Sequence, residues 1–335
     1  MASLWQWMMG FLLFFFFLLL LATFPVVDAG HPDWEHARFP STEFLSLKPG
    51  LGSHFWPEST IPLCYESDDT RNIFHDILWA AMRLWYAAGL PERFRLLEIN
   101  GQSCTDKPWE SLYVKQTRDL FSSDIGMPMV NMEGTPFYPP VNKPTLHVFI
   151  NRANMQWTIK QVAHELGHSF GLLHEHQDPS FWGLHSTERV FKFNCIYLVD
   201  FNEVTKDLSV EEIWGIHGVC KDQRQANSVG FRAADWLPEQ GEIYSSHWWW
   251  ADASMVDWDS IMLYQSFSDT IDYDNKPVLS RYSDAWTWGP NWSPSVGDVA
   301  ALKTIYHSFW VNPSLPFWND IRSPYYEVFR QFSSC

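Results

Sequence analysis

Apolar side chains recur at helical spacing in three stretches of the chain. One stretch runs from Thr70 to Gly89, and another lies between Ser295 and Phe309. In the central stretch, residues 159, 162, 163, 166 and 170 are apolar, and these intervals place them on one side of a helix. Each pattern predicts an amphipathic helix with one buried face, and Gly89 can supply the left-handed residue that ends the first.

Strand patterns precede the central helix. Ile61, Leu63 and Tyr65 alternate as on a strand, and short runs typical of strands follow at 94–99, 111–116 and 145–150. Residues 178–255 carry only short helical signals. We therefore predict an α+β fold with a sheet and helices in its N-terminal part, and a mostly irregular C-terminal part with a final helix.

The first 29 residues form an apolar segment that stands apart from this pattern. They contain the run GFLLFFFFLLLLATFPVV, and Val27 and Ala29 are small enough for signal-peptidase cleavage before Gly30. We predict a signal peptide at 1–29; because the run approaches membrane-spanning length, an uncleaved anchor is the alternative. The remaining boundaries are a leader or pro-segment at 30–55, one folded domain at 56–309 and a C-terminal tail at 310–335.

Composition and charge exclude several classes of function. Hydrophobic residues make up 46% of the chain and charged residues 19%, which is typical of a globular protein and not of a disordered one. A formal net charge of −16 repels phosphate backbones and anionic lipids. We therefore expect no nucleic-acid partner and no stable membrane association after signal removal.

Export to an oxidising compartment favours disulfides among the five cysteines. Four of them, Cys64, Cys104, Cys195 and Cys220, lie inside the predicted domain and allow three pairings. We favour the pairing of nearest neighbours, Cys64 with Cys104 and Cys195 with Cys220. Cys335 is left over and is free, joined to another chain, or part of a different pairing.

The central helix carries chemistry beside its apolar stripe. Thr158 followed by Gln161 is a capping-box pattern, so we predict that the helix begins there. His164 and His168 are four residues apart and project side by side from a different strip of the helix. Two imidazoles at this spacing can bind one metal ion, and Glu165 beside them is suited to hold a water molecule without ligating the metal.

A third histidine follows the predicted helix. Gly171 tolerates the positive φ that ends a helix abruptly, so the chain can turn back and bring His174 to the same ion. Three protein ligands with an open fourth position are the common arrangement of catalytic zinc. The sequence therefore predicts one Zn²⁺ per chain, held by His164, His168 and His174.

From His164 to His174 the chain reads HExxHxxGxxH, and here it resembles the metzincin zinc endopeptidases. The segment DSIMLY resembles the Met-turn of that family, with Met262 as the matching residue. Within the metzincins, the chain is similar to the astacin family in three features: Glu175 directly after the third histidine, the Met-turn pattern S-x-M-x-Y, and the segment WPESTIP, which resembles the start of an astacin catalytic domain.

The resemblance implies a metzincin-type catalytic domain, in which a twisted mixed sheet is combined with the active-site helix. It implies that Glu165 is the general base and that Tyr264, two places after the Met-turn methionine, helps to stabilise the tetrahedral intermediate. Glu175 matches the glutamate that receives the new amino terminus through water in processed astacins. Gly171 and Met262 would support the site.

Several positions depart from the astacin pattern. Leu263 replaces the histidine that many astacins carry in the Met-turn, and the residues after His174 lack the usual R-x-D-R-D. The leader shows no F-x-G-D, the motif that silences the zinc in many astacin precursors. We therefore expect a divergent member with its own activation and loop structure.

These observations predict a secreted, extracellular and monomeric zinc endopeptidase that acts on protein or peptide substrates. Because metzincins pair their substrate with an edge strand, residues 145–150 are the predicted substrate strand. The alternative is a secreted, zinc-stabilised pseudoenzyme that binds protein or carbohydrate through aromatic residues such as 247–250. Asn291 begins a sequon that is followed by Pro294, which leaves its glycosylation open.

Overall fold

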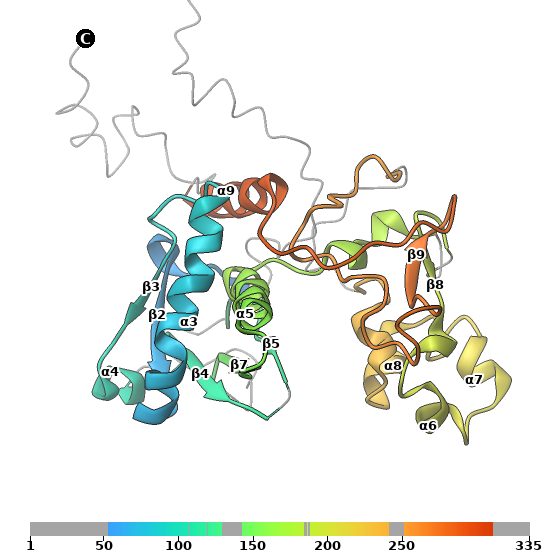
Figure 1. The fold of residues 1–335 in the computed structure, drawn as a ribbon, viewed down its shortest axis with the longest axis horizontal. Coiled ribbons are helices and arrows are strands. Elements are labelled where there is room, and N and C mark those ends of the chain that lie inside the picture. Colours follow the sequence, from blue (N-terminus) through green and yellow to red (C-terminus); the bar gives the residue numbers. More distant parts are fainter. Residues whose placement is uncertain are drawn as a thin grey trace, which may run out of the picture. The chain divides into compact units, whose positions relative to one another are not determined.

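The computed structural model describes residues 53–106, 108–118, 120–128, 143–183, 186, 188–240 and 251–310 (Figure 1). All of these belong to one compact unit. The predicted signal peptide, residues 30–52 of the predicted leader, residues 247–250 and 311–335, including Cys335, lie outside the described residues. No helix in the described part of the chain is long and apolar enough to cross a membrane.

A five-stranded sheet has the order β3-β2-β4-β7-β5. Its strands are β2 (Thr60–Tyr65), β3 (Arg95–Glu98), β4 (Leu112–Gln116), β5 (Ser122–Ser123) and β7 (Thr145–Val148). The strands β3, β2, β4 and β7 pair in parallel, each with the next in this order. In this sheet only β5 runs antiparallel, against β7. The fold is thus a mixed, mainly parallel sheet with helices. The prediction that residues 145–150 form an edge strand is wrong, because β5 covers β7 and itself forms the edge.

Two long helices accompany the sheet, α3 (Asp68–Ala87) and α5 (Met155–Phe170) (Figure 1). The Ser67 side chain caps α3 by accepting from the backbone of Thr70, and Gly89 ends it at a φ of 99° as predicted. The helices pack directly on each other: Trp85 Nε1 donates to the carbonyl of Ala163 at 2.9 Å.

The start of α5 differs from the sequence prediction. Its N-cap is Asn154, whose side chain accepts from the backbone of Trp157, so the helix begins one turn before Thr158. Thr158 is buried inside the helix, where its hydroxyl accepts from the backbone of Asn151 at 3.0 Å. The capping-box pattern failed because Asn154 offers a cap earlier in the chain and Thr158 is used to secure the preceding loop.

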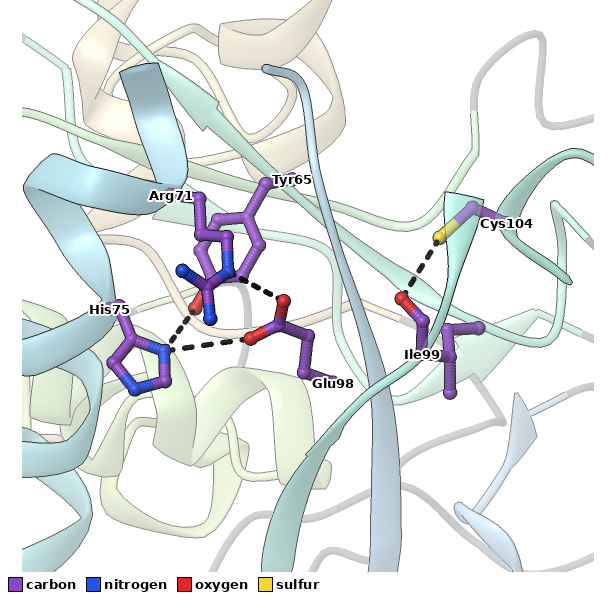
Figure 2. A network of polar contacts seen from close by, with 6 residues as sticks. All are labelled: Tyr65, Arg71, His75, Glu98, Ile99 and Cys104. Carbon is purple, nitrogen blue, oxygen red and sulfur yellow. Dashed lines mark hydrogen bonds and ion pairs between the residues drawn. The ribbon is translucent and has the colours of Figure 1, made fainter. Parts of the chain in front are cut away.

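A polar network joins α3 to the ends of β2 and β3 (Figure 2). Arg71 of α3 pairs with Glu98 at 2.6 Å, and His75 lies 3.6 Å from the second oxygen of the same carboxylate. The Tyr65 hydroxyl lies 3.5 Å from His75 Nδ1. Next to this network, Cys64 of β2 and Cys104 form a disulfide. These contacts tie α3 to β2 and β3, and the disulfide ties β2 to the segment that contains Cys104.

The rest of the chain adds short elements and one further long helix, α9. They are η1 (Pro57–Ser59), α4 (Gly101–Asp106), η2 (Glu175–Gln177), η3 (Pro179–Phe181), η5 (Cys195–Tyr197), α6 (Phe201–Thr205), α7 (Val210–Trp214), α8 (Gln223–Ser228), η6 (Arg232–Asp235) and α9 (Val296–Trp310). Two small antiparallel pairs complete them, β1 (Ser53–His54) with β6 (Met127–Pro128), and β8 (Phe191–Phe193) with β9 (Leu279–Arg281). A second disulfide joins Cys195 to Cys220, so both pairings of nearest neighbours are present.

Buried apolar residues form two cores. The first combines the sheet with α3, α5 and α9, and it includes Ile261 and Met262. The second lies between Phe181 and Trp288 and includes Leu263. The chain therefore crosses from one core to the other between Met262 and Leu263, within the predicted Met-turn.

Candidate metal centre and active site

The end of α5 brings the three histidines together. Gly171 takes a φ of 109°, and the backbone N–H groups of Gly171 and Leu172 donate to the carbonyls of His168 and Gly167, which closes the helix and reverses the chain. The positive φ disfavours any residue with a side chain, and a Cβ at Gly171 would also lie 3.2 Å from the ring of Phe55, which would have to shift slightly. His174 then returns towards the helix.

The Nε2 atoms of the three imidazoles converge. His174 Nε2 lies 3.3 Å from His164 Nε2 and 3.0 Å from His168 Nε2. The Nδ1 atoms of His164 and His168 face the backbone carbonyls of Ile261 and Leu172 at 2.7 and 2.8 Å. A carbonyl oxygen only accepts, so each Nδ1 carries the proton and each Nε2 presents a lone pair.

This arrangement fits a metal ion. Bare nitrogens 3.0 to 3.3 Å apart repel one another, unless a cation attracts their lone pairs. Zinc binds imidazole nitrogen at about 2.0–2.1 Å with tetrahedral geometry, which places neighbouring nitrogens about 3.3 Å apart. Within the described residues, His164, His168 and His174 form the group able to hold a metal ion. The cluster is the one that the resemblance to astacin-like zinc metalloproteases implies.

Burial keeps these histidines neutral. It lowers the pKa of His168 to about 4 and moves the pKa values of His164 and His174 well below their ordinary value. The charge that each imidazole would carry disfavours protonation of the others as well. Neutral imidazole is the form that binds a metal, so the site is arranged for ligation near neutral pH.

Glu165 lies beside the histidines at a cavity of about 420 Å³. Its carboxyl is buried, and its Oε2 has no hydrogen-bond partner in the described part of the chain. Burial raises the pKa of the Glu165 carboxyl to about 8. A buried carboxyl oxygen that lacks a protein partner and faces a cavity is available to a water molecule or a substrate.

Tyr264 is another residue of this cavity. Its ring centroid lies 4.2 Å from that of His174 and 5.9 Å from that of His164, and Tyr264 lines the cavity with Glu165. Burial raises the pKa of its phenol well above the ordinary value, which keeps the hydroxyl protonated and able to donate. The residue stands 99 positions after Glu165 in sequence, and the fold brings them to one cavity.

The predicted Met-turn is hydrogen-bonded to the histidine motif and to the residue that follows it. Besides the bond from His164 to Ile261, the Met262 carbonyl accepts from the backbone of Glu175 at 3.1 Å. The Met262 side chain packs where Gly167 leaves room, because a Cβ on Gly167 would lie 2.5 Å from its sulfur. The absence of a side chain at Gly167 thus lets Met262 pack against α5.

Glu175 is buried beside the metal centre. Its Oε1 accepts from the backbone of Asp257 at 3.0 Å, which ties the residue after the third histidine to the segment that leads into the Met-turn. Burial is the main cause that raises the pKa of its carboxyl well above the ordinary value.

Two residues at the site were missed by the sequence reasoning. Gln177 accepts from His174 Nδ1 at 2.7 Å, and Asp298 of α9 accepts from the Ser260 hydroxyl at 2.6 Å and the Ile261 backbone at 2.9 Å. Gln177 stands three residues after His174, but this spacing alone does not predict a contact, because a glutamine at such a position can have many other partners. Asp298 carried no signal, because it is 36 residues away from Met262 in sequence.

In the structure, the side chain of Asn291, the first residue of the sequon, is engaged in two hydrogen bonds. Asn291 Nδ2 donates to the carbonyls of Trp258 and Ser260 at 2.9 and 2.8 Å. This nitrogen is the atom that N-glycosylation would modify. In the fold it instead holds the segment that leads into the Met-turn.

Comparisons with known proteins give structural likenesses only. No protein-family model and no curated protein matches the sequence. A solved structure of high choriolytic enzyme 1, a hatching enzyme zinc-protease from Oryzias latipes (medaka fish), is similar at 13% identity and a TM-score of 0.44, covering 76% of this chain and 94% of that one. Two structures of myroilysin, each 15% identical and covering 75% of this chain, have TM-scores of 0.39 and 0.37 and are covered over 95% and 85%.

Proposed function

We propose that the chain is a secreted, zinc-dependent endopeptidase of the astacin-like kind. The observation that carries the proposal is the convergence of three Nε2 lone pairs from His164, His168 and His174 next to an unpartnered carboxyl oxygen of Glu165. A metal centre and a proton acceptor at one cavity are the elements that hydrolysis of a peptide bond requires.

In this proposal the three histidines hold one zinc ion, which when bound supplies Lewis-acid activation of the attacking water and of the substrate carbonyl. Glu165 acts as a carboxylate, the form that the positive charge of a bound ion would favour over the neutral acid. It accepts the proton of the attacking water and later delivers it to the departing amine, because its carboxyl faces the cavity and is held within α5. The Tyr264 hydroxyl donates to the developing oxyanion.

The edge strand β5 supplies a place for the substrate backbone. Ser122 and Ser123 line the cavity and pair on one side with β7. An extended peptide can add to the other side of such a strand through main-chain hydrogen bonds. We therefore assign substrate pairing to β5, in place of the strand at 145–150.

Maturation follows from the same resemblance. A new amino terminus, formed when a pro-segment is removed, would be received by Glu175 next to the third histidine. Signal cleavage before Gly30, a monomeric state and protein or peptide substrates complete the proposal. N-terminal sequencing of the secreted protein tests the processing steps directly.

The decisive experiment compares the wild type with Glu165→Ala on casein and gelatin. We expect the wild type to clear both substrates and to lose this activity with 1,10-phenanthroline, whereas Glu165→Ala binds zinc but cleaves neither. The exposed Glu203 lies on α6, and Glu203→Ala is the matched control that keeps full activity. Full proteolysis by Glu165→Ala would overturn the assignment. Zinc binding with no chelator-sensitive cleavage by the wild type, after trial activation, would favour the binding-module alternative.

A further inference from the structure

The three histidines differ in what holds them. The Nδ1 atoms of His164 and His168 donate to the backbone carbonyls of Ile261 and Leu172. A substitution of Ile261 or Leu172 changes the side chain and leaves the carbonyl in place. His174 Nδ1 instead meets a side chain, Gln177 Oε1, at 2.7 Å. The orientation of the third histidine therefore depends on one replaceable residue.

The direction of the Gln177 amide is determined by its surroundings. Its Nε2 lies 3.1 Å from the carbonyl of Ala234 and 3.0 Å from that of Leu237. Both carbonyls only accept, so the NH₂ group must face them and the amide oxygen must face His174. An amide oxygen only accepts, so His174 Nδ1 must carry the proton and its Nε2 must be bare.

Gln177 is buried and all of its polar groups are paired. Its backbone N–H donates to the His174 carbonyl at 3.0 Å, and its own carbonyl accepts from Glu239 at 2.9 Å. Ala234 and Glu239 both line the cavity beside the metal centre. One side chain thus joins the third histidine to a wall of the cavity.

We propose that Gln177 is a positioning residue that fixes the Nδ1–H tautomer of His174 and links the metal centre to the cavity wall at 234–239. The inference rests on the proposed function, which supplies the zinc ion, and adds to it the residue that orients His174 for binding. Outer hydrogen-bond partners of metal-binding histidines typically change metal affinity by about 10- to 100-fold.

The test uses three variants of the full secreted protein. Gln177→Met keeps the volume and removes both interactions. Gln177→Glu keeps an acceptor for His174 but sets a carboxylate against two carbonyls. Gln223→Met is the matched control. Gln223 lines the same cavity and donates to the Ala234 carbonyl at 3.4 Å, but it has no hydrogen bond to His174 among those of the described residues.

Two readouts separate the inference from the function. Zinc affinity, measured by competition with a chelator, is expected to fall about 10- to 100-fold in Gln177→Met, to be largely retained in Gln177→Glu and to stay unchanged in Gln223→Met. The ¹⁵N chemical shifts of His174 in metal-free protein are expected to show Nδ1–H in the wild type and a mixture of tautomers in Gln177→Met.

Each outcome has one meaning. Either an unchanged zinc affinity or an unchanged His174 tautomer in Gln177→Met would overturn the inference. If Gln177→Met does not fold, loss of either the zinc affinity or the Nδ1–H tautomer in Gln177→Glu overturns it, and retention of both supports it. If the wild type binds no zinc, the proposed function fails, while the tautomer in metal-free protein still decides the role of Gln177.

Discussion

Gly167 lies between the two helical histidines and owes its role to space. Its backbone is helical, so no unusual φ requires glycine there. A Cβ would nevertheless lie 2.5 Å from the Met262 sulfur and 3.2 Å from the ring of Trp85. Both neighbours are buried, and Trp85 is also held by its hydrogen bond to α5. The second x of the HExxH motif is therefore restricted to a residue without a side chain, because Met262 of the Met-turn occupies the space.

We expect Gly167→Ala to lower the free energy of unfolding by about 1–3 kcal/mol, the typical cost of overpacking, despite the better helix propensity of alanine. Urea unfolding followed by circular dichroism measures the change. The control is Gly101→Ala in α4, where a Cβ meets nothing within 4 Å. Equal stability of Gly167→Ala and the wild type would show that Met262 does not occupy this space.

At the scale of elements, α9 holds the Met-turn through one carboxyl group. Asp298 stands in the first turn of α9 and accepts from the Ser260 hydroxyl and the backbone of Ile261. Ile261 in turn accepts from His164, so the final helix and the active-site helix are connected through two bonds. The last helix of the domain thereby takes part in shaping the metal centre.

This carboxyl predicts a pH dependence of stability. Burial raises the pKa of Asp298 from 3.8 to about 6, with its hydrogen bonds acting in the opposite direction. Because the folded pKa lies above the unfolded one, the associated stability is present below pH 3.8 and is lost as the pH rises through 6. The shift of about two units corresponds to about 3 kcal/mol.

We therefore expect the difference in unfolding free energy between the wild type and Asp298→Asn to change by about 2 kcal/mol between pH 4 and pH 7, to the disadvantage of the wild type at the higher pH, because the unfolded carboxyl is already partly ionised at pH 4. Measurements in metal-free protein avoid the pH dependence of zinc binding. Glu203→Gln, on the surface of α6, should follow the wild-type profile. A difference that stays constant with pH would contradict the prediction.

At the scale of the whole domain, the metal centre joins the two cores. His164 and His168 lie on α5 in the first core, whereas Gln177 ties His174 to Ala234 in the second. The Met-turn crosses between the cores at the same place. An ion bound by all three histidines would therefore oppose separation of the two parts.

Removal of zinc should lower the thermal midpoint of unfolding. At free zinc a hundredfold above its Kd, binding to the folded state alone adds about 3 kcal/mol. Calorimetry with and without 1,10-phenanthroline measures the effect. Glu165→Ala, which retains the three histidines, should show the same dependence, and His168→Ala should show much less. An unchanged midpoint for the wild type after chelation would exclude a zinc ion in the folded protein.

Much of the architecture was predictable because its patterns are local. The long helices, the four parallel strands and the stops at Gly89 and Gly171 follow from periodicity and from the freedom of glycine at positive φ. The errors also have local reasons. Asn154 caps α5 ahead of Thr158, and a two-residue strand such as β5 is too short to leave a periodic signal that would reveal the true edge of the sheet.

The sequence by itself determined the chemistry of the centre. Histidines four apart, a glutamate beside the first and a glycine before the third specify ligands, base and turn through helix geometry alone. Only the tertiary structure decided how these groups are held, because Gln177, Gly167 and Asp298 act through contacts with segments that are distant in sequence. Such contacts depend on how two cores pack, and no spacing along the chain encodes that.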